Sequence, residues 1–113
     1  MVDVAQEHRS CNAAITLAFS ILGKRWNGVI VGALEQGPAS FVVLRRAIGG
    51  ISDTVLSERL GELAEAGLVR RTVTEGPPVS VSYELTPGGA ELTPLLDQIG
   101  EWARKNMRRP GAE

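Results

Sequence analysis

The feature that most constrains the fold of this chain is a change in the spacing of its apolar residues. Before Gly67 they recur at the helical period of 3.6, and between residues 69 and 85 they alternate with polar residues at the strand period of two. After Thr86 and Pro87 the helical period returns and continues to Met107. This order predicts a mainly α fold with a small β-hairpin, of the α+β class.

Capping and breaking residues divide the first part of the chain into four predicted helices. The first covers residues 13–22, and the second begins at Trp26 and stops at residues 36–38, which read Gln-Gly-Pro. Ser40 and Ser52 are expected to cap the third and fourth helices. The predicted buried stripe of the second helix is Trp26, Val29, Ile30, Ala33 and Leu34.

The hairpin and the last helix carry equally clear signals. Residues 76–78, Gly-Pro-Pro, cannot continue a strand ladder and predict the tip of the hairpin. Thr86 followed by Pro87 predicts a capped helix start. The inward residues of the hairpin are expected to be Val69, Val73, Val79, Val81, Tyr83 and Leu85. The stripe of the last helix is Leu92, Leu95, Leu96, Ile99, Trp102, Ala103 and Met107.

The first and last helices predict a homodimer. Residues 13–22 are apolar almost all round the helix, with Thr16 and Ser20 as the only polar residues. A surface helix normally keeps one solvated face, so we expect a second chain to cover this one. Trp26 and Trp102 lie on apolar stripes and are expected in the core or in the dimer interface. The whole pattern is that of a winged helix-turn-helix with dimerisation helices at both ends.

Composition limits the possible functions. The length of 113 residues predicts one domain over residues 1–113, with flexible ends at 1–10 and 109–113. No signal peptide or membrane span is recognisable, so a cytoplasmic protein is expected. The only histidine is His8 and the only cysteine is Cys11, which predicts no zinc or other metal site, no cofactor and no enzymatic activity. A small hydrolase would lack a general base.

The third and fourth helices predict a DNA-binding surface. A short helix, a glycine-containing turn and a second helix form a helix-turn-helix. The side of the fourth helix opposite its apolar stripe is expected to be free, and it carries Asp53, Thr54, Ser57, Glu58, Gly61 and Glu62. The candidate contacts to double-stranded DNA are Lys24, Arg25, Arg46, Ser52, Thr54, Ser57, Glu58 and Arg59.

Each basic candidate has a plainer interpretation. The pairs Lys24-Arg25, Arg45-Arg46 and Arg70-Arg71 either contact phosphates or form an ordinary solvated surface. Arg59 is favoured as a structural residue that pairs with a carboxylate. The net charge of −1 argues mildly against DNA binding. The acidic residues of the fourth helix, Asp53, Glu58, Glu62 and Glu65, favour the alternative function, which is a winged-helix module that binds proteins and has lost DNA binding.

Several segments resemble the HxlR-type transcription regulators. They are Cys11, residues 23–26 (Gly-Lys-Arg-Trp), residues 41–52, residues 56–60 (Leu-Ser-Glu-Arg-Leu), residues 65–69 and residues 83–86. The resemblance implies a bacterial dimeric winged-helix regulator that usually binds an operator near the genes it controls. A repressor is expected. The chain departs from the family pattern at Asn12, Arg25, Thr54, Glu58, Gly61 and Val79. These departures argue against base readout through arginine-to-guanine contacts. They predict either a modest affinity for DNA or binding that depends on Lys24, Arg25 and DNA shape.

Cys11 is the candidate redox sensor. The resemblance implies that some family members sense oxidants or electrophiles through the matching cysteine. The start of the first helix and Arg9 are expected to favour the reactive thiolate. A small-molecule or redox effector is therefore expected. The alternative is that Cys11 is a small buried apolar residue.

Overall fold

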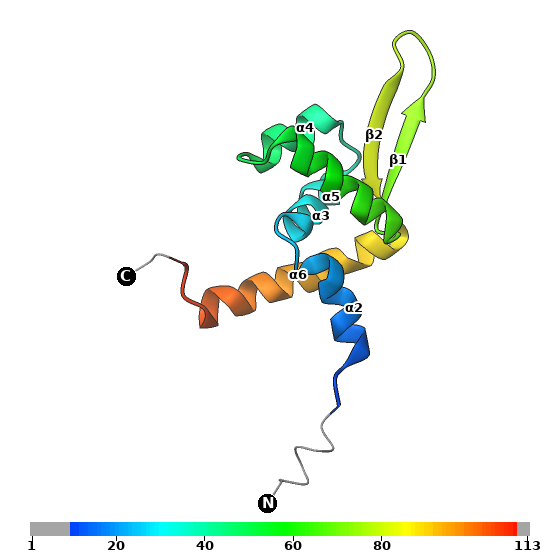
Figure 1. Cartoon of the computed structure of the whole chain (residues 1–113). Coiled ribbons are helices and arrows are strands. Elements are labelled where there is room, and N and C mark those ends of the chain that lie inside the picture. Colours follow the sequence, from blue (N-terminus) through cyan, green and yellow to red (C-terminus); the bar gives the residue numbers. More distant parts are fainter. Residues whose placement is uncertain (1–9, 111–113) are drawn as a thin grey trace, which may run out of the picture.

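The computed structural model describes residues 10–110, in which one antiparallel hairpin projects from a group of helices (Figure 1). The elements are α2 (Ala13–Leu22), α3 (Asn27–Ala33) with a 3₁₀ turn (Leu34–Gln36), α4 (Phe41–Ile48), α5 (Asp53–Glu65), β1 (Val69–Thr74), β2 (Ser80–Leu85) and α6 (Pro87–Asn106). The predicted fold class, mainly α with a hairpin wing, is confirmed. Residues 1–9 and 111–113, which belong to the ends predicted to be flexible, lie outside the described residues.

The predicted helix starts are confirmed at three caps. The Ser40 hydroxyl accepts a hydrogen bond from the Val43 amide at 3.2 Å, and the Ser52 hydroxyl accepts one from the Val55 amide at 3.1 Å. Thr86 caps α6 by accepting from the Gly89 amide at 3.1 Å. A hydroxyl at this position satisfies an amide that has no partner inside the helix, so each of these boundaries can be predicted from sequence.

The start of α3 differs from the prediction. Trp26 lies outside the helix in a left-handed conformation, with φ of 84°, and α3 begins at Asn27. The buried stripe is consequently turned by one residue, and it consists of Asn27, Ile30, Val31 and Leu34. Val29, predicted to be buried, is 54% exposed. Asn27 is not part of the predicted stripe, and its side chain is fully buried.

The core joins α3, α4, α5 and β1. Its buried members are Ile30, Val31, Leu34, Leu44, Ile51, Leu56, Leu60, Leu63 and Val69. The hairpin pairs Val69 with Leu85 and Thr74 with Ser80, and Tyr83 exchanges both backbone hydrogen bonds with Ala39, at 2.9 and 2.8 Å. Val79, predicted to lie on the inner face of the hairpin, precedes β2 and is 65% exposed. We refer to α3 through β2 as the head.

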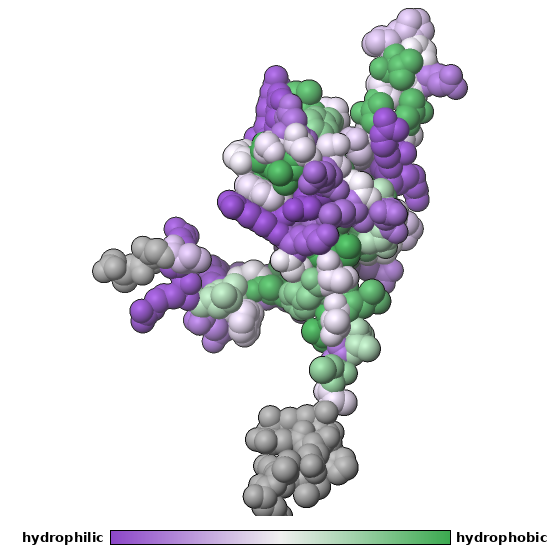
Figure 2. Space-filling model, viewed as in Figure 1, coloured by the Kyte–Doolittle hydropathy of each residue, from purple (hydrophilic) through white to green (hydrophobic). Residues whose placement is uncertain are grey.

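Helices α2 and α6 extend from the head and cross below it (Figure 1). No residue of α2 is buried, and only Gly89 and Thr93 of α6 are. Figure 2 shows the resulting apolar surface along α2 and α6, below a polar surface over α4 and α5. The exposed apolar residues of the two helices are Ile15, Leu17, Phe19, Leu95, Ile99 and Trp102. Trp102, predicted in the core or dimer interface, is therefore outside the core of a single chain.

Gly89 fixes the contact between α6 and the head. A Cβ atom at this residue would lie 2.1 Å from the carbonyl oxygen of Leu68, which is closer than any real contact of that kind. Thr86 strengthens the same contact by donating its hydroxyl to the Gly67 carbonyl at 2.6 Å. Of the helices between residues 10 and 110, none is long and apolar enough to cross a membrane.

Candidate nucleic-acid interface

Helices α4 and α5 form the predicted helix-turn-helix. The turn between them contains Gly49 and Gly50, whose φ values of 67° and 75° suit glycine. On the inner side, Leu44, Ile51 and Leu56 anchor both helices to the core. These contacts fix the core-facing side of the N-terminal half of α5, and the opposite side of the helix is exposed to solvent.

The side chains predicted to read bases lie together on this open side. Thr54, Ser57, Glu58 and Gly61 are exposed, and their spacing places them on one face of α5. Ser52 is exposed at the start of the helix, with its hydroxyl engaged in the cap. Asp53 is paired with Arg45, whose Nη1 lies 3.0 and 3.2 Å from the two carboxylate oxygens. Amide groups and hydroxyls at a helix N-terminus suit phosphate and base edges.

Glu62 was predicted on the free face of α5, and this prediction is wrong. Its Oε2 accepts hydrogen bonds from Lys24 Nζ and from Arg59 Nη1, each at 3.0 Å. The side chain of Glu62 is 28% exposed and that of Arg59 is 22% exposed. Arg59 thus makes the carboxylate contact of its favoured structural interpretation.

Electrostatics at Glu62 follow from these contacts. The hydrogen bond from Lys24 lowers the pKa of Glu62 below its usual 4.5, and the charge of Arg59 and the amide of Asn27 act in the same direction. Burial raises the pKa, with a smaller effect than the sum of the others. Glu62 is therefore ionised at neutral pH and neutralises part of the positive charge that was expected for DNA.

The other basic candidates differ in how far they are engaged. The Arg25 guanidinium lies 4.6 Å from the centre of the Trp26 ring, and Arg70 pairs with Glu84 at 3.2 Å. Arg46 is exposed on α4, and no ion pair within residues 10–110 involves it. Lys24 keeps 47% of its side chain exposed, and an ammonium has three donors, so its pair with Glu62 leaves capacity for a phosphate.

Sequence reasoning missed Asn27. Its Nδ2 donates to the Ile21 carbonyl at 2.8 Å, which ties the start of α3 to the last turn of α2. The available signal was positional, because an asparagine next to Ile30 and Val31 on the same helical face has to satisfy its amide inside the protein.

Cys11 is exposed and lies one residue before Asn12, the cap of α2. The Asn12 side chain accepts hydrogen bonds from the amides of Ala14 and Ile15 at 3.0 and 3.1 Å. The alternative of a buried apolar cysteine is therefore wrong for the single chain. Arg9, expected to favour the thiolate, and His8 lie outside the described residues.

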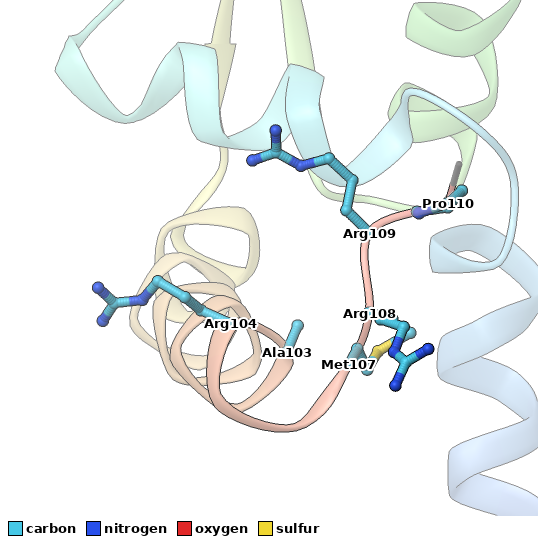
Figure 3. A pocket seen from close by; sticks show the side chains of 6 residues that line it. All are labelled: Ala103, Arg104, Met107, Arg108, Arg109 and Pro110. Atoms are coloured by element: carbon cyan, nitrogen blue, oxygen red, sulfur yellow. The ribbon is translucent and has the colours of Figure 1, made fainter. Parts of the chain in front are cut away.

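A hollow of about 670 Å³ lies beyond the end of α6, lined by Ala103, Arg104, Met107, Arg108, Arg109 and Pro110. Figure 3 shows the guanidinium groups of its three arginines pointing away from one another. They do not converge on one ligand position. Within residues 10–110, no group of three His, Cys, Asp or Glu side chains is placed to hold a metal ion.

Two further hollows, of about 400 and 390 Å³, lie between α2 and α6. Both are lined mainly by apolar residues, among them Leu17, Ile21, Leu92 and Leu95 for the first and Phe19, Ile99 and Trp102 for the second. The apolar surface of α2 and α6 is thus grooved, and the first hollow also touches Ala66 and Leu68 of the head.

The fold and the exposed face of α5 define a winged helix-turn-helix protein, and known proteins match it along most of the chain. The family model described as HxlR-like helix-turn-helix matches residues 21–110. The HTH-type transcriptional regulator YodB of Bacillus subtilis is 43% identical over 86 residues, which are 76% of this chain and 77% of YodB.

Solved structures agree. The reduced form of YodB matches with a TM-score of 0.80 at 38% identity, covering 91% of this chain and all of that one. YodB has also been solved after diamide treatment and with a bound quinone, and these structures match with TM-scores of 0.74 and 0.73. The redox regulator HypR in its oxidised form matches with a TM-score of 0.76 at 29% identity, covering 85% of this chain and 99% of that one.

This chain belongs to the HxlR-like helix-turn-helix family, and it is a DNA-binding transcription regulator. The predicted resemblance is confirmed. The comparisons do not favour the alternative of a protein-interaction module that has lost DNA binding, because the relatives are transcriptional regulators.

Proposed function

We propose that this protein is a homodimeric repressor that reads an operator with the N-terminal half of α5 and responds to an oxidant or electrophile. The observation that carries the DNA-reading part is the exposed face of α5, on which Thr54 and Ser57 lie one turn apart. A dimer seated on an operator excludes other proteins from the same DNA, which is the simplest route to repression. Such a regulator acts on the chromosome, so the proposal places it in the cytoplasm. The proposal also treats residues 1–113 as one domain.

The dimer part of the proposal is supported by α2 and α6. Leu17 is 73% exposed and Trp102 is 57% exposed, and apolar residues of this size form a continuous surface with grooves between the two helices. A contiguous exposed apolar surface normally marks an interface. Obligate dimers bury about 2,000 Å² or more, and the apolar faces of two long helices suit that scale.

Roles within the DNA surface are tested by affinity and salt dependence. Replacing Thr54 and Ser57 by alanine is expected to relax sequence preference at particular base pairs. Arg46→Ala is expected to weaken binding to all duplexes alike and to lower the salt slope by about one unit, because it loses a phosphate contact. The measurement is gel-shift titration at several salt concentrations, with a duplex enriched by the wild type from a random library and with poly(dI-dC). A change of preference in Arg46→Ala with an unchanged slope would reverse these roles.

The effector part of the proposal rests on Cys11. Its thiol is exposed beside the start of α2, so modification there acts next to the proposed dimer surface. The matching structures of YodB after diamide treatment and with quinone, and of oxidised HypR, concern proteins of the same fold. This chain has no second cysteine, so any disulfide joins two subunits or a small thiol.

Diamide and a quinone are the probes for this part. We expect each to weaken operator binding by the wild type, and Cys11→Ser to bind DNA but not to respond. Non-reducing electrophoresis distinguishes a disulfide between subunits from a mixed disulfide. Equal loss of binding in both proteins would place the response at another residue, and no loss in either would end the sensor proposal.

A further inference from the structure

One carboxylate connects two distant parts of the chain. Glu62 lies in the second half of α5, and Lys24 lies 38 residues earlier, in the turn between α2 and α3. Both Lys24 and Arg59 donate to the same oxygen of Glu62, at 3.0 Å each. The contact therefore links the DNA-reading helix directly to the turn that follows α2.

The same turn is held from inside by Asn27. Its fully buried side chain donates to the carbonyl of Ile21 in α2, and its own backbone amide donates to the Lys24 carbonyl at 3.3 Å. Between these residues Trp26 adopts its left-handed conformation. A backbone of this kind persists only where its surroundings fix it. Lys24 and Asn27 are the side chains that attach it to α5 and α2.

The side chains of Lys24, Asn27, Arg59 and Glu62 form a polar cluster between α5 and the turn that follows α2. Asn27 Oδ1, Arg59 Nε and Glu62 Oε1 are buried and make no hydrogen bond within the described chain. The two ion pairs of Glu62 are only partly buried, with 47% of the Lys24 side chain and 28% of the Glu62 side chain exposed, so they add little stability. Such contacts can instead favour one relative position of the elements that they join, because other packings leave a charge unpaired.

We propose that Glu62 is a positioning residue that fixes the orientation of α5 relative to α2, so that the base-reading face and the proposed dimer surface keep one geometry. This inference rests on the proposed function, because it assumes that α5 reads DNA. Glu62 does not itself contact DNA in this proposal. It acts through Lys24 and Arg59.

Removing the charge of Glu62 tests the proposal, because a positioning role and simple electrostatics predict opposite changes in the affinity for the selected duplex. Glu62→Gln removes one negative charge, so electrostatics alone strengthens binding to every duplex. If Glu62 positions α5, binding to the selected duplex weakens about tenfold, within the range of coupling between residues of one network, while binding to poly(dI-dC) is unchanged or tighter. Glu65→Gln is the matched control, since Glu65 is exposed on the same helix and makes no ion pair among the described residues.

The experiment uses full-length protein and fluorescence anisotropy. It measures the affinity for the selected duplex divided by the affinity for poly(dI-dC). The selected duplex is one that the wild type enriches from a random library. We expect the ratio to fall about tenfold in Glu62→Gln and to change less than about twofold in Glu65→Gln. If circular dichroism shows that Glu62→Gln is unfolded, Lys24→Gln replaces it, because it keeps the Glu62–Arg59 pair, and the same fall in the ratio is expected.

The double variant Lys24→Gln/Glu62→Gln completes the test. Two residues that act through one contact give non-additive effects. The ratio of affinities in the double variant is therefore expected to equal the lower of the two ratios measured in the single variants. Additive losses, or a ratio unchanged in Glu62→Gln, would overturn the positioning role. Failure of the wild type to enrich any sequence would overturn the proposed DNA reading and this inference with it, which separates the two failures.

Discussion

The head and the two long helices bury their apolar residues in different ways. In the head, Ile30, Leu56 and Leu63 are completely buried within one chain. In α2 and α6, apolar residues of the same size are about half exposed or more, among them Phe19, Leu95 and Ile99. Both regions carry apolar residues at helical spacing, so periodicity identifies an apolar face but not what covers it. The difference separates a part whose apolar residues are covered within one chain from a part whose apolar residues stay exposed, and in our proposal a second chain covers the latter.

The largest effect is expected from the core of the head. Leu56→Ala should lower the free energy of unfolding by about 2–5 kcal/mol, because it leaves a cavity in a close-packed site. Urea denaturation followed by circular dichroism measures this loss. Leu17→Ala, in the exposed surface of α2, is the control and should cost much less at protein concentrations where the chain is monomeric. An equal decrease in the free energy of unfolding in both variants would show that the head and the long helices do not differ in how their apolar residues contribute to stability.

A charge in the long helices is expected to act on association instead. Leu95→Asp should raise the dimer dissociation constant about 100-fold, because burying an unpaired carboxylate in an interface costs about 3 kcal/mol or more. Sedimentation velocity over a concentration series measures the change. Val42→Asp introduces the same group at an exposed apolar residue of α4 and should leave the dimer unaffected. A dimer as tight as that of the wild type in Leu95→Asp would show that α6 is not the interface.

A smaller effect is expected at the cap of α5. Ser52→Ala should lower the stability of the head by about 1 kcal/mol, because the amide of Val55 loses its acceptor. Ser52→Asp should restore most of this loss, since aspartate also caps helices. Urea denaturation of both variants separates the capping role from any contact to DNA, which Ser52→Asp would weaken by repulsion. A stable Ser52→Ala variant would show that the cap is dispensable.

The smallest effect is the pH dependence contributed by Glu62. Its folded-state pKa is lowered, so its contribution to stability is complete above the usual 4.5 and is lost as the pH falls through the folded-state value. The difference in urea midpoint between the wild type and Glu62→Gln should therefore be larger at pH 7 than at pH 3. A difference that does not change with pH would mean that ionisation of Glu62 contributes nothing to the head.

The local parts of the fold could be predicted from sequence, and the long-range parts could not. Caps such as Ser40 and Thr86 depend on amides three residues away, and all three predicted caps are present. The buried face of α3 was displaced by one residue because Asn27 is satisfied by a carbonyl in another helix. Glu62 was assigned to solvent for the same reason, since its partner Lys24 lies 38 residues away. The exposed face with Thr54 and Ser57 needed only the helical period.

In the proposed dimer, Gly89 determines the spacing between the two operator half-sites as well as a contact within the protein. Because residue 89 has no side chain, the first turn of α6 lies against the Leu68 carbonyl and leaves the head at one angle. In the proposed dimer this angle determines how far apart the two copies of α5 are. Half-sites on one face of B-DNA repeat about every 34 Å, so the angle selects the number of base pairs between them. A methyl group at residue 89 would alter the operator spacing that the dimer fits and leave the bases read in each half-site unchanged.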